Sequence, residues 1–204
     1  LLAVVALLCW HLNTSGMPLG TAIRQSSFNA VSIMTGTGYG NADFSAWGGF
    51  ASTLLLIAMF IGGCGGSTTC GIKVFRLQVL ATTARVQISR LLRPHAVVLA
   101  YYNKRPVAPE VMDSVMGFFY LYILCFVLLS ILLGMMGLDF VTALSGAATS
   151  ISNVGPGLGN LIGANGNFAT VPDAAKWVMA FGMLLGRLEL FTVLVMLTPA
   201  FWSR

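Results

Sequence analysis

The chain contains the same unusual unit twice. Each copy has a short stretch of mixed polar and apolar residues with helical character, 26–33 or 143–152. A Gly-rich run follows, 34–41 or 153–160, and then a long hydrophobic stretch. Gly-rich, non-helical backbone in an apolar protein is tolerated only where other protein buries it or water wets it. Exposed backbone carbonyls are also what a cation filter requires. The duplication therefore indicates an ion pathway built from two related units.

The two Gly-rich runs can be aligned on their last residues, Asn41 and Asn160. Three pairs of glycines then coincide: Gly36 with Gly155, Gly38 with Gly157, and Gly40 with Gly159. This alignment predicts that Gly36 and Gly155 occupy equivalent positions in the two units.

Composition places the chain in a membrane. Hydrophobic residues make up 57% of it and charged residues only 8%, which is outside the usual range for a soluble domain. Charge-poor stretches cover 1–10, 47–61, 115–138 and 177–202. The third exceeds the roughly 20 residues that a spanning helix needs. The first is too short, and we expect it to be the end of a helix that begins before residue 1. The predicted fold class is all-α integral membrane.

The net charge of +5 comes largely from one region. Basic side chains gather between the second and third apolar stretches, and the positive-inside rule assigns such a loop to the cytoplasm. They are Lys73, Arg76, Arg85, Arg90, Arg93, Lys104 and Arg105. We therefore expect 73–113 and the C-terminus to be cytoplasmic. The basic loop is expected to contact membrane lipid headgroups or a protein regulator, and no nucleic acid.

The sequence carries no recognisable catalytic or transition-metal site. Cys9, Cys64, Cys70 and Cys125 show no CxxC spacing, so four free thiols are expected. No Ser/His/Asp or Cys/His set lies on one side of the membrane. The chain is therefore predicted not to be an enzyme.

Three motifs resemble the TrkH/KtrB family of potassium-transport proteins: the runs 35–41 and 152–160 and the terminal GRLEL sequence at 186–190. They are similar to the third and fourth repeats of that family. The resemblance implies two tandem helix–pore loop–helix repeats of a K⁺-channel-like pseudo-fourfold pore, with two further repeats missing on the N-terminal side. It assigns 1–80 to the third repeat, whose first helix is truncated, 81–113 to a cytoplasmic basic linker, and 114–204 to the fourth repeat.

The resemblance also implies potassium transport across the bacterial inner (plasma) membrane, with the chain crossing the membrane several times. The expected partners are a second copy in a homodimer and a cytosolic nucleotide-binding ring similar to TrkA. Potassium would be the transported ligand, without a covalently bound cofactor. The alternative that the sequence leaves open is a non-conducting membrane scaffold or regulatory subunit.

The Gly-rich runs are predicted to form the filter, because carbonyls there can replace part of the hydration shell of K⁺. The residues expected to carry this role are Thr35, Gly36, Thr37, Asn153, Val154 and Gly155. By resemblance, Gly36 and Gly155 take the glycine position on which selectivity depends. Such runs can alternatively form ordinary turns. The duplication of the Gly-rich runs favours the filter.

A third Gly-rich run, 62–71, interrupts the apolar stretch that begins at Trp47. Four glycines in five positions cannot hold a stable helix, since each costs about 1 kcal/mol relative to Ala. By resemblance this is an intramembrane gating loop, and its residues are Gly62, Gly63, Gly65, Gly66, Ser67, Thr68, Thr69 and Gly71. The alternative is a passive kink. A phosphate-binding loop is not expected, because Ile72 stands at the lysine position of that motif.

Arg187 is expected within the last apolar helix, where a charge costs about 3 kcal/mol. It should therefore face water or a partner. By resemblance, Arg187 lies near the cavity and the gating loop, where it would tune cation occupancy and contact the loop. The alternative is a buried ion pair that fixes helix packing.

Overall fold

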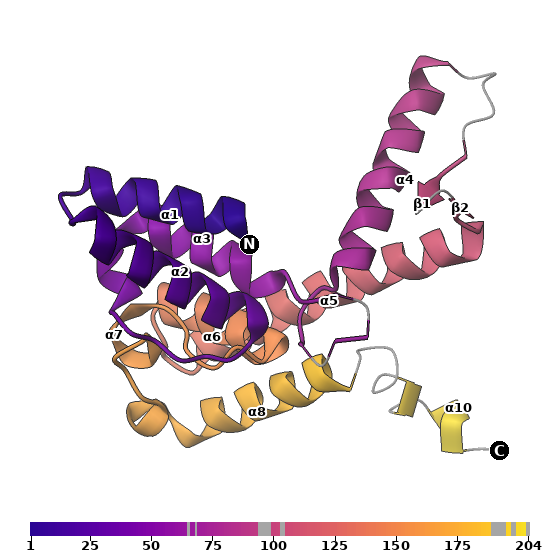
Figure 1. Cartoon of the computed structure of the whole chain (residues 1–204). Coiled ribbons are helices and arrows are strands. Elements are labelled where there is room, and N and C mark those ends of the chain that lie inside the picture. The colour runs from indigo at the N-terminus through magenta and orange to yellow at the C-terminus, as the bar shows by residue number, and fades with distance from the viewer. Residues whose placement is uncertain are drawn as a thin grey trace.

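The computed structural model describes residues 1–64, 66–67, 69–93, 99–102, 105–188, 195–196 and 199–202. Helices dominate this part of the chain, as predicted. They are arranged as two groups of three, separated by a protruding helix (Figure 1).

The first group contains α1 (Leu2–Thr14), α2 (Leu19–Thr35) and α3 (Gly49–Phe60). Helix α2 packs against both of the others. A short 3₁₀ turn, η1 (Phe44–Trp47), leads into α3, and Asp43 caps it by accepting a hydrogen bond from the Ser45 amide at 3.0 Å.

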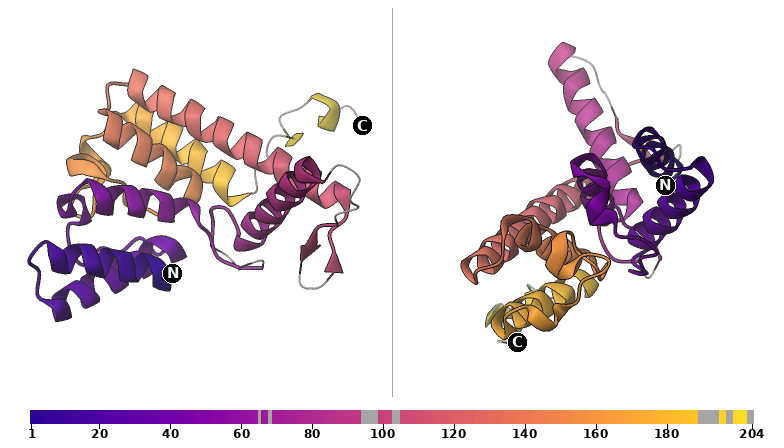
Figure 2. Two further views of the ribbon diagram at one scale, coloured as in Figure 1. Left: turned by 90° about the horizontal axis from the view of Figure 1, so that it is seen from above. Right: turned by 90° about the vertical axis from the view of Figure 1, so that its left-hand side faces the viewer.

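The second group contains α5 (Pro109–Met135), α6 (Phe140–Ser152) and α8 (Asp173–Arg187). The three helices pack side by side (Figure 2). A single turn of helix, α7 (Gly159–Ile162), and a 3₁₀ turn, η2 (Phe168–Thr170), join α6 to α8. The order of two long helices, a Gly-rich segment and a third helix is therefore the same in both groups.

Among the described residues, only α5 is long and apolar enough to cross a bilayer by length and composition. This agrees with the prediction for 115–138. Helices α1, α3 and α6 are apolar but shorter. The helices that contain the predicted stretches 26–33 and 143–152 are longer than expected: α2 extends beyond 26–33 at both ends, and α6 begins at Phe140.

The described part of the predicted linker, 81–93, 99–102 and 105–113, contains regular secondary structure. Helix α4 (Val74–Leu92) leaves the body at a steep angle, and the short hairpin β1 (Tyr101–Tyr102) and β2 (Arg105–Pro106) precedes α5 (Figure 1). The predicted boundary at 80/81 lies inside α4, and the one at 113/114 lies inside α5. No structural break therefore separates the linker from either repeat at these points.

Helix α8 ends at Arg187, inside the apolar stretch 177–202 in which we expected one helix. Leu188 has φ −89° and ψ 9°, which ends α8. Residues 189–194, 197–198 and 203–204 lie outside the described part, and Pro199–Trp202 form the short helix α10.

Two apolar clusters fill the body, and aromatic rings connect them. One lies mainly in the second helix group, and the other lies in the first group but also includes Ala148, Val154 and Leu158 of the second. Phe60, at the end of α3, packs against Tyr122 and Phe126 of α5, with ring centroids 6.1 and 5.1 Å apart. The end of α3 is thereby fixed to the second group.

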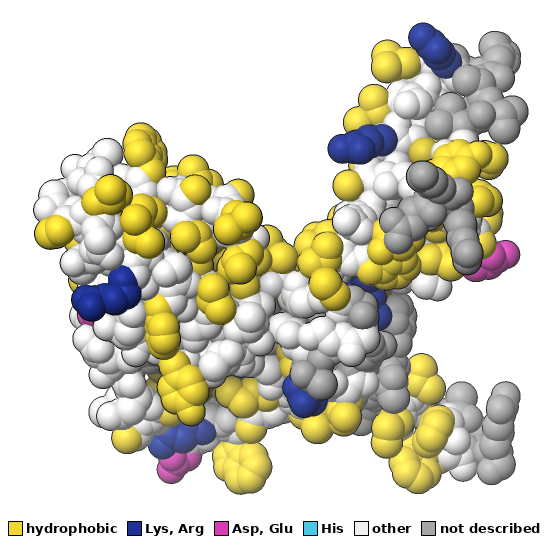
Figure 3. All heavy atoms as spheres, in the orientation of Figure 1, with side chains coloured by type: hydrophobic (Ala, Val, Ile, Leu, Met, Phe, Trp, Pro, Cys, Tyr) yellow, Lys and Arg dark blue, Asp and Glu magenta, His cyan; other side chains and the backbone are white. Residues whose placement is uncertain are grey.

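Large apolar side chains also cover much of the surface (Figure 3). Leu2 on α1 is 84% exposed, Tyr120 on α5 is 68% exposed, and Trp177 on α8 is 78% exposed. A soluble monomer rarely exposes apolar area of this extent, which instead suits contact with lipid or further protein.

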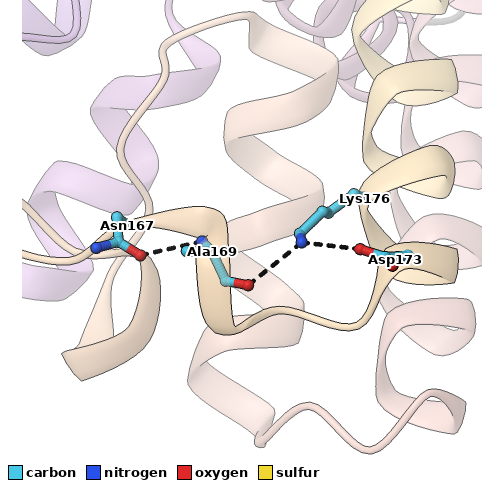
Figure 4. A network of polar contacts seen from close by, with 4 residues as sticks. All are labelled: Asn167, Ala169, Asp173 and Lys176. Atoms are coloured by element: carbon cyan, nitrogen blue, oxygen red, sulfur yellow. Dashed lines mark hydrogen bonds and ion pairs between the residues drawn. The ribbon is translucent and has the colours of Figure 1, made fainter.

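One polar network stands out at the start of α8 (Figure 4). Lys176 Nζ donates to the Asp173 carboxylate at 2.9 Å and to the Ala169 carbonyl at 3.3 Å. The Ala169 amide donates to Asn167 Oδ1 at 3.0 Å. These contacts fix the turn that carries the chain from η2 into α8.

Candidate functional site

Helices α2 and α6 end in the same way. Each ends at a residue in the left-handed conformation, Gly36 (φ 70°) after α2 and Asn153 (φ 52°) after α6. The amide of the next residue then donates back to a carbonyl in the last turn, from Thr37 to Ser32 at 2.9 Å and from Val154 to Thr149 at 3.1 Å. This is the backbone pattern of a Schellman cap, in which Asn is the usual substitute for Gly.

This shared cap corrects the sequence alignment. Gly36 is equivalent to Asn153, and Gly38 (φ 79°) is equivalent to Gly155 (φ 113°). The pairing of Gly36 with Gly155 was wrong by two residues, because the runs were aligned on their terminal Asn residues. An alignment on the left-handed residue that ends each helix would have found Gly38.

The two segments after the caps lie against each other. A methyl group on Gly155 would be 3.7 Å from Gly38 Cα, and one on Gly36 would be 3.5 Å from the Asn153 carbonyl oxygen. A methyl group on Gly38 would collide with the Val154 carbonyl oxygen. Gly38 is therefore needed both for its positive φ and for this close approach.

Side chains of α2 and α6 hold each segment in place. Asn29 Nδ2 donates to Asn41 Oδ1 at 2.7 Å in the first unit. In the second, Ser145 Oγ accepts from the Leu158 amide at 2.9 Å and donates to the Leu158 carbonyl at 3.3 Å. Both anchors are buried, so each Gly-rich segment is fixed at its far end.

The predicted filter residues all lie at this junction. The hydroxyls of Thr35 and Thr37 are 2.8 Å apart, and Val154 is buried. Asn153 Nδ2 donates to the Met183 carbonyl at 3.0 Å, which ties the cap of α6 to α8. The Gly155 amide donates to Thr149 Oγ1 at 2.9 Å. Thr149 therefore helps to hold Gly155 in place, a role that was not predicted from the sequence.

The run 62–71 forms a closed loop between α3 and α4. Its base is a backbone pair, in which the Gly62 amide donates to the Ile72 carbonyl at 2.9 Å and the Ile72 amide donates to the Phe60 carbonyl at 2.8 Å. Gly66 and Gly71 have φ of 87° and 82°. Gly63 is packed tightly, since a methyl group there would lie 3.0 Å from the hydroxyls of Ser67 and Thr69. Gly65 and Thr68 of the predicted gating set lie outside the described residues.

This loop lies next to the first Gly-rich segment. A methyl group on Gly36 would be 3.9 Å from Thr69 Cγ2. Thr69 is in turn fixed within the loop, where its Oγ1 is 2.8 Å from Ser67 Oγ. The structure therefore brings the predicted loop and the predicted filter into proximity.

Arg187 reaches the loop, but not from a helix interior as we expected. It is the last residue of α8 and is exposed, and its Nη1 donates to Cys70 Sγ at 3.5 Å. The end of the helix explains the position, because a cation is favourable where the helix dipole leaves unpaired carbonyls. Gly186 lets α8 approach α6, since a methyl group there would overlap the Ile151 carbonyl.

A buried hydrogen bond links α5 to the end of α6. Tyr122 Oη is 2.8 Å from Ser152 Oγ, and both side chains are buried. Tyr122 also packs on Phe60, which is adjacent to the base of the loop. Tyr122 could not be singled out from the sequence, because a tyrosine in an apolar helix usually indicates an interfacial residue.

No group of three or more His, Cys, Asp or Glu residues that could hold a metal ion occurs in the described part of the chain. Cys9, Cys64, Cys70 and Cys125 are all free, as predicted. His11 is used structurally, with Nε2 3.0 Å from the Trp47 carbonyl oxygen.

The fold and the exposed apolar surface define an all-α membrane protein with two related halves. The sequence profile of the family described as "Cation transport protein" (TrkH) matches residues 10–204, and the chain therefore belongs to this family, as the motifs indicated. The family description names transport, in agreement with the prediction that the chain is not an enzyme.

Several relatives are similar over nearly the whole chain. The Trk system potassium uptake protein TrkI of Halomonas elongata is 47% identical over 204 residues, which are 100% of this chain and 41% of that protein. TrkH of Escherichia coli is 36% identical over 202 residues, which are 99% of this chain and 41% of that protein. The chain thus spans about two fifths of the length of these relatives.

The fold matches a solved structure of the same family. The crystal structure of the potassium transporter TrkH from Vibrio parahaemolyticus superposes with a TM-score of 0.90 at 38% sequence identity, covering 99% of this chain and 43% of that one.

Proposed function

We propose that this chain is the C-terminal part of a potassium uptake protein of the plasma membrane and contributes two pore-loop repeats to a pseudo-fourfold, K⁺-channel-like pore. The names of the relatives, which are potassium uptake proteins, support the transported ion. The observation that carries the pore is the close approach of Gly38 and Gly155, two glycines with positive φ at equivalent positions after equivalent helices.

Potassium would pass where the Gly-rich segments meet. Carbonyl oxygens of 35–38 and 153–155 would replace part of the hydration shell of the ion. The buried anchors at Asn29 and Ser145 hold the segments, so their carbonyls need little rearrangement when K⁺ binds. With the corrected register, Gly38 and Gly155 take the position on which selectivity depends, in place of Gly36 and Gly155.

The loop after α3 would act as the gate. Its described residues in the predicted gating set are Gly62, Gly63, Gly66, Ser67, Thr69 and Gly71. Thr69 lies next to Gly36 of the first Gly-rich segment, and Arg187 donates to Cys70 of the loop. The backbone pair between Gly62 and Ile72 closes the base, so that the loop can move as a unit about it. Potassium would pass when the loop leaves Gly36.

Two repeats cannot close a fourfold ring, so we propose that the remaining N-terminal part of the protein supplies the other two. A homodimer and a cytosolic nucleotide-binding ring similar to TrkA are the proposed partners. The segment 73–113 and the C-terminus would face the cytoplasm, in the bacterial inner membrane.

The test is flux of K⁺ and Na⁺ into liposomes that contain the complete protein, with Gly38→Ser and Gly155→Ser beside it. Gly20→Ser is the matched control, because Gly20 lies on α2 with no atom within 4 Å of an added Cβ. Two results together support the pore. The unmodified protein and the Gly20→Ser control pass K⁺ in preference to Na⁺, and at least one of the filter variants also admits Na⁺. An assembled protein that passes neither ion with its cytosolic partner present would instead be a scaffold.

A further inference from the structure

The equivalent glycines Gly38 and Gly155 donate their amides to different kinds of acceptor. In the second unit, the Gly155 amide donates to the hydroxyl of Thr149 at 2.9 Å. In the first unit, the Gly38 amide donates to the backbone carbonyl of Ser32 at 3.3 Å. Ser32 and Thr149 each stand four residues before the left-handed cap of their helix, so these two residues are equivalent as well.

The Ser32 hydroxyl does not bond to the first Gly-rich segment. Ser32 is buried, and its Oγ has no hydrogen-bond partner among the described residues. The Ser32 carbonyl instead accepts from two amides, from Thr37 at 2.9 Å and from Gly38 at 3.3 Å. The second distance is beyond the usual limit of about 3.2 Å for an N–H···O bond. The Gly38 amide is therefore held weakly.

In the second unit, Thr149 provides two separate acceptors. Its carbonyl accepts from the Val154 amide at 3.1 Å, and its hydroxyl accepts from the Gly155 amide. Thr149 is fully buried, so water does not compete for this bond. The Gly155 amide consequently has a short bond to an acceptor of its own.

This bond fixes the direction of a carbonyl. The Gly155 amide and the Val154 carbonyl belong to one planar trans peptide group, so they point in opposite directions. The amide points back to Thr149 on α6, and the Val154 carbonyl points away from α6. It faces the first segment, where a methyl group on Gly38 would collide with it. Turning this peptide group over would break the bond to Thr149.

We propose that Thr149 is a positioning residue of the filter, and that the preference for K⁺ over Na⁺ depends on its hydroxyl and not on the equivalent hydroxyl of Ser32. Na⁺ is smaller than K⁺, so filter carbonyls must turn or move inward to replace its hydration shell. The bond to Thr149 resists such movement of the Val154 carbonyl. This role in selectivity rests on the proposed function, whereas the difference between the two amide bonds does not.

The first test is the ratio of K⁺ to Na⁺ flux into liposomes that contain the complete protein. Thr149→Val removes the hydroxyl and keeps the shape of the side chain. We expect the ratio to fall about tenfold, as for the loss of one buried hydrogen bond. Thr149→Ser keeps a hydroxyl and should restore the ratio. Ser32→Ala is the matched control at the equivalent position and should leave the ratio unchanged, because it removes a hydroxyl without a partner among the described residues.

The flux results separate the possible failures. A merely structural role would lower the melting temperature of Thr149→Val and leave its flux ratio unchanged, and this result would overturn the inference while the proposed function stands. An equal fall of the ratio in Ser32→Ala would also overturn it. An unmodified protein that shows no preference for K⁺ would refute the proposed function itself.

The second test needs no variant, so it remains decisive if Thr149→Val does not assemble. Hydrogen exchange of glycine amides can be followed by NMR in the unmodified complete protein. We expect the Gly155 amide to exchange about tenfold or more slowly than the Gly38 amide, because only the former has a short bond to a buried acceptor of its own. Equal exchange at the two amides would overturn the inference.

Discussion

Gly38 and Gly155 lie against each other at the junction of the two helix groups, with 3.7 Å between Gly38 Cα and the position of a methyl group on Gly155. Both have a positive φ, and both stand two residues beyond a left-handed helix cap. The two halves of the chain therefore meet through equivalent backbone positions, which is the relation expected of repeats around one axis.

The corrected register predicts which glycine tolerates asparagine. Gly36→Asn should retain K⁺ uptake and thermal stability, because Asn153 occupies the same left-handed cap in the second unit. Gly38→Asn should abolish uptake, because its Cβ would collide with the Val154 carbonyl. Uptake by cells that lack other K⁺ transporters measures both. Equal loss in the two variants would contradict the register.

The hydrogen bond between Tyr122 and Ser152 should stabilise the protein measurably. Tyr122→Phe leaves a buried serine hydroxyl without its partner, and we expect it to cost about 1–3 kcal/mol. Thermal unfolding of Tyr122→Phe, Ser152→Ala and the double variant forms a complete cycle. If the loss of unfolding free energy in the double variant equals the sum of the losses in the two single variants, the two side chains are not coupled.

Gly186 should be required for the packing of α8 on α6. Gly186→Ala introduces a methyl group that overlaps the Ile151 carbonyl, and we expect a loss of about 1–3 kcal/mol from the displacement of α8. Gly134→Ala, on α5, has no atom within 4 Å of the added Cβ and should be neutral or stabilising. Melting temperatures compare the two, and an unchanged Gly186→Ala protein would exclude the tight contact.

Asp139 should stabilise the start of α6 in a pH-dependent way. Its carboxylate accepts from the Thr142 amide at 3.2 Å, and hydrogen bonds from Thr142, first from its side chain, lower the pKa of Asp139. Because the pKa is lower in the folded state, the stabilisation is complete above the unfolded pKa of about 3.9 and is lost as the pH falls through the lowered value.

Asp139→Ala should cost about 0.5–2 kcal/mol near neutral pH, as for other N-cap residues. Asp139→Asn should keep most of the cap without this acid-dependent loss. Thermal unfolding at neutral and acidic pH measures both variants. The same pH dependence in Asp139→Asn as in the unmodified protein would assign the acid effect to another group.

The contact between Arg187 and Cys70 should hold the gating loop closed. Arg187→Gln shortens and neutralises the side chain that donates to the Cys70 thiol. We expect higher K⁺ flux in the absence of the cytosolic partner, with assembly unchanged. Lys176→Gln is the control, because Lys176 forms an exposed pair with Asp173 at the start of α8. Flux that stays the same in both variants would remove Arg187 from the gate.

Sequence alone determined the membrane class, the duplicated unit, the break after α3 and the family. Each of these depends on local composition or on a short motif, and both can be recognised without knowing the tertiary structure. Apolar length predicted α5, and the density of glycine between residues 62 and 71 predicted that no helix could form there.

Only the tertiary structure decided the register between the two units and the partners of the functional side chains. Asn153 adopts the left-handed conformation that Gly36 adopts in the first unit. An alignment by residue identity therefore paired Gly36 with Gly155 instead of with Asn153. Arg187 ends a helix where an apolar run predicted its middle. Gly38 meets Val154, Tyr122 meets Ser152, and Arg187 meets Cys70, all across long separations in sequence. Such contacts depend on how whole helices pack, which no local pattern encodes.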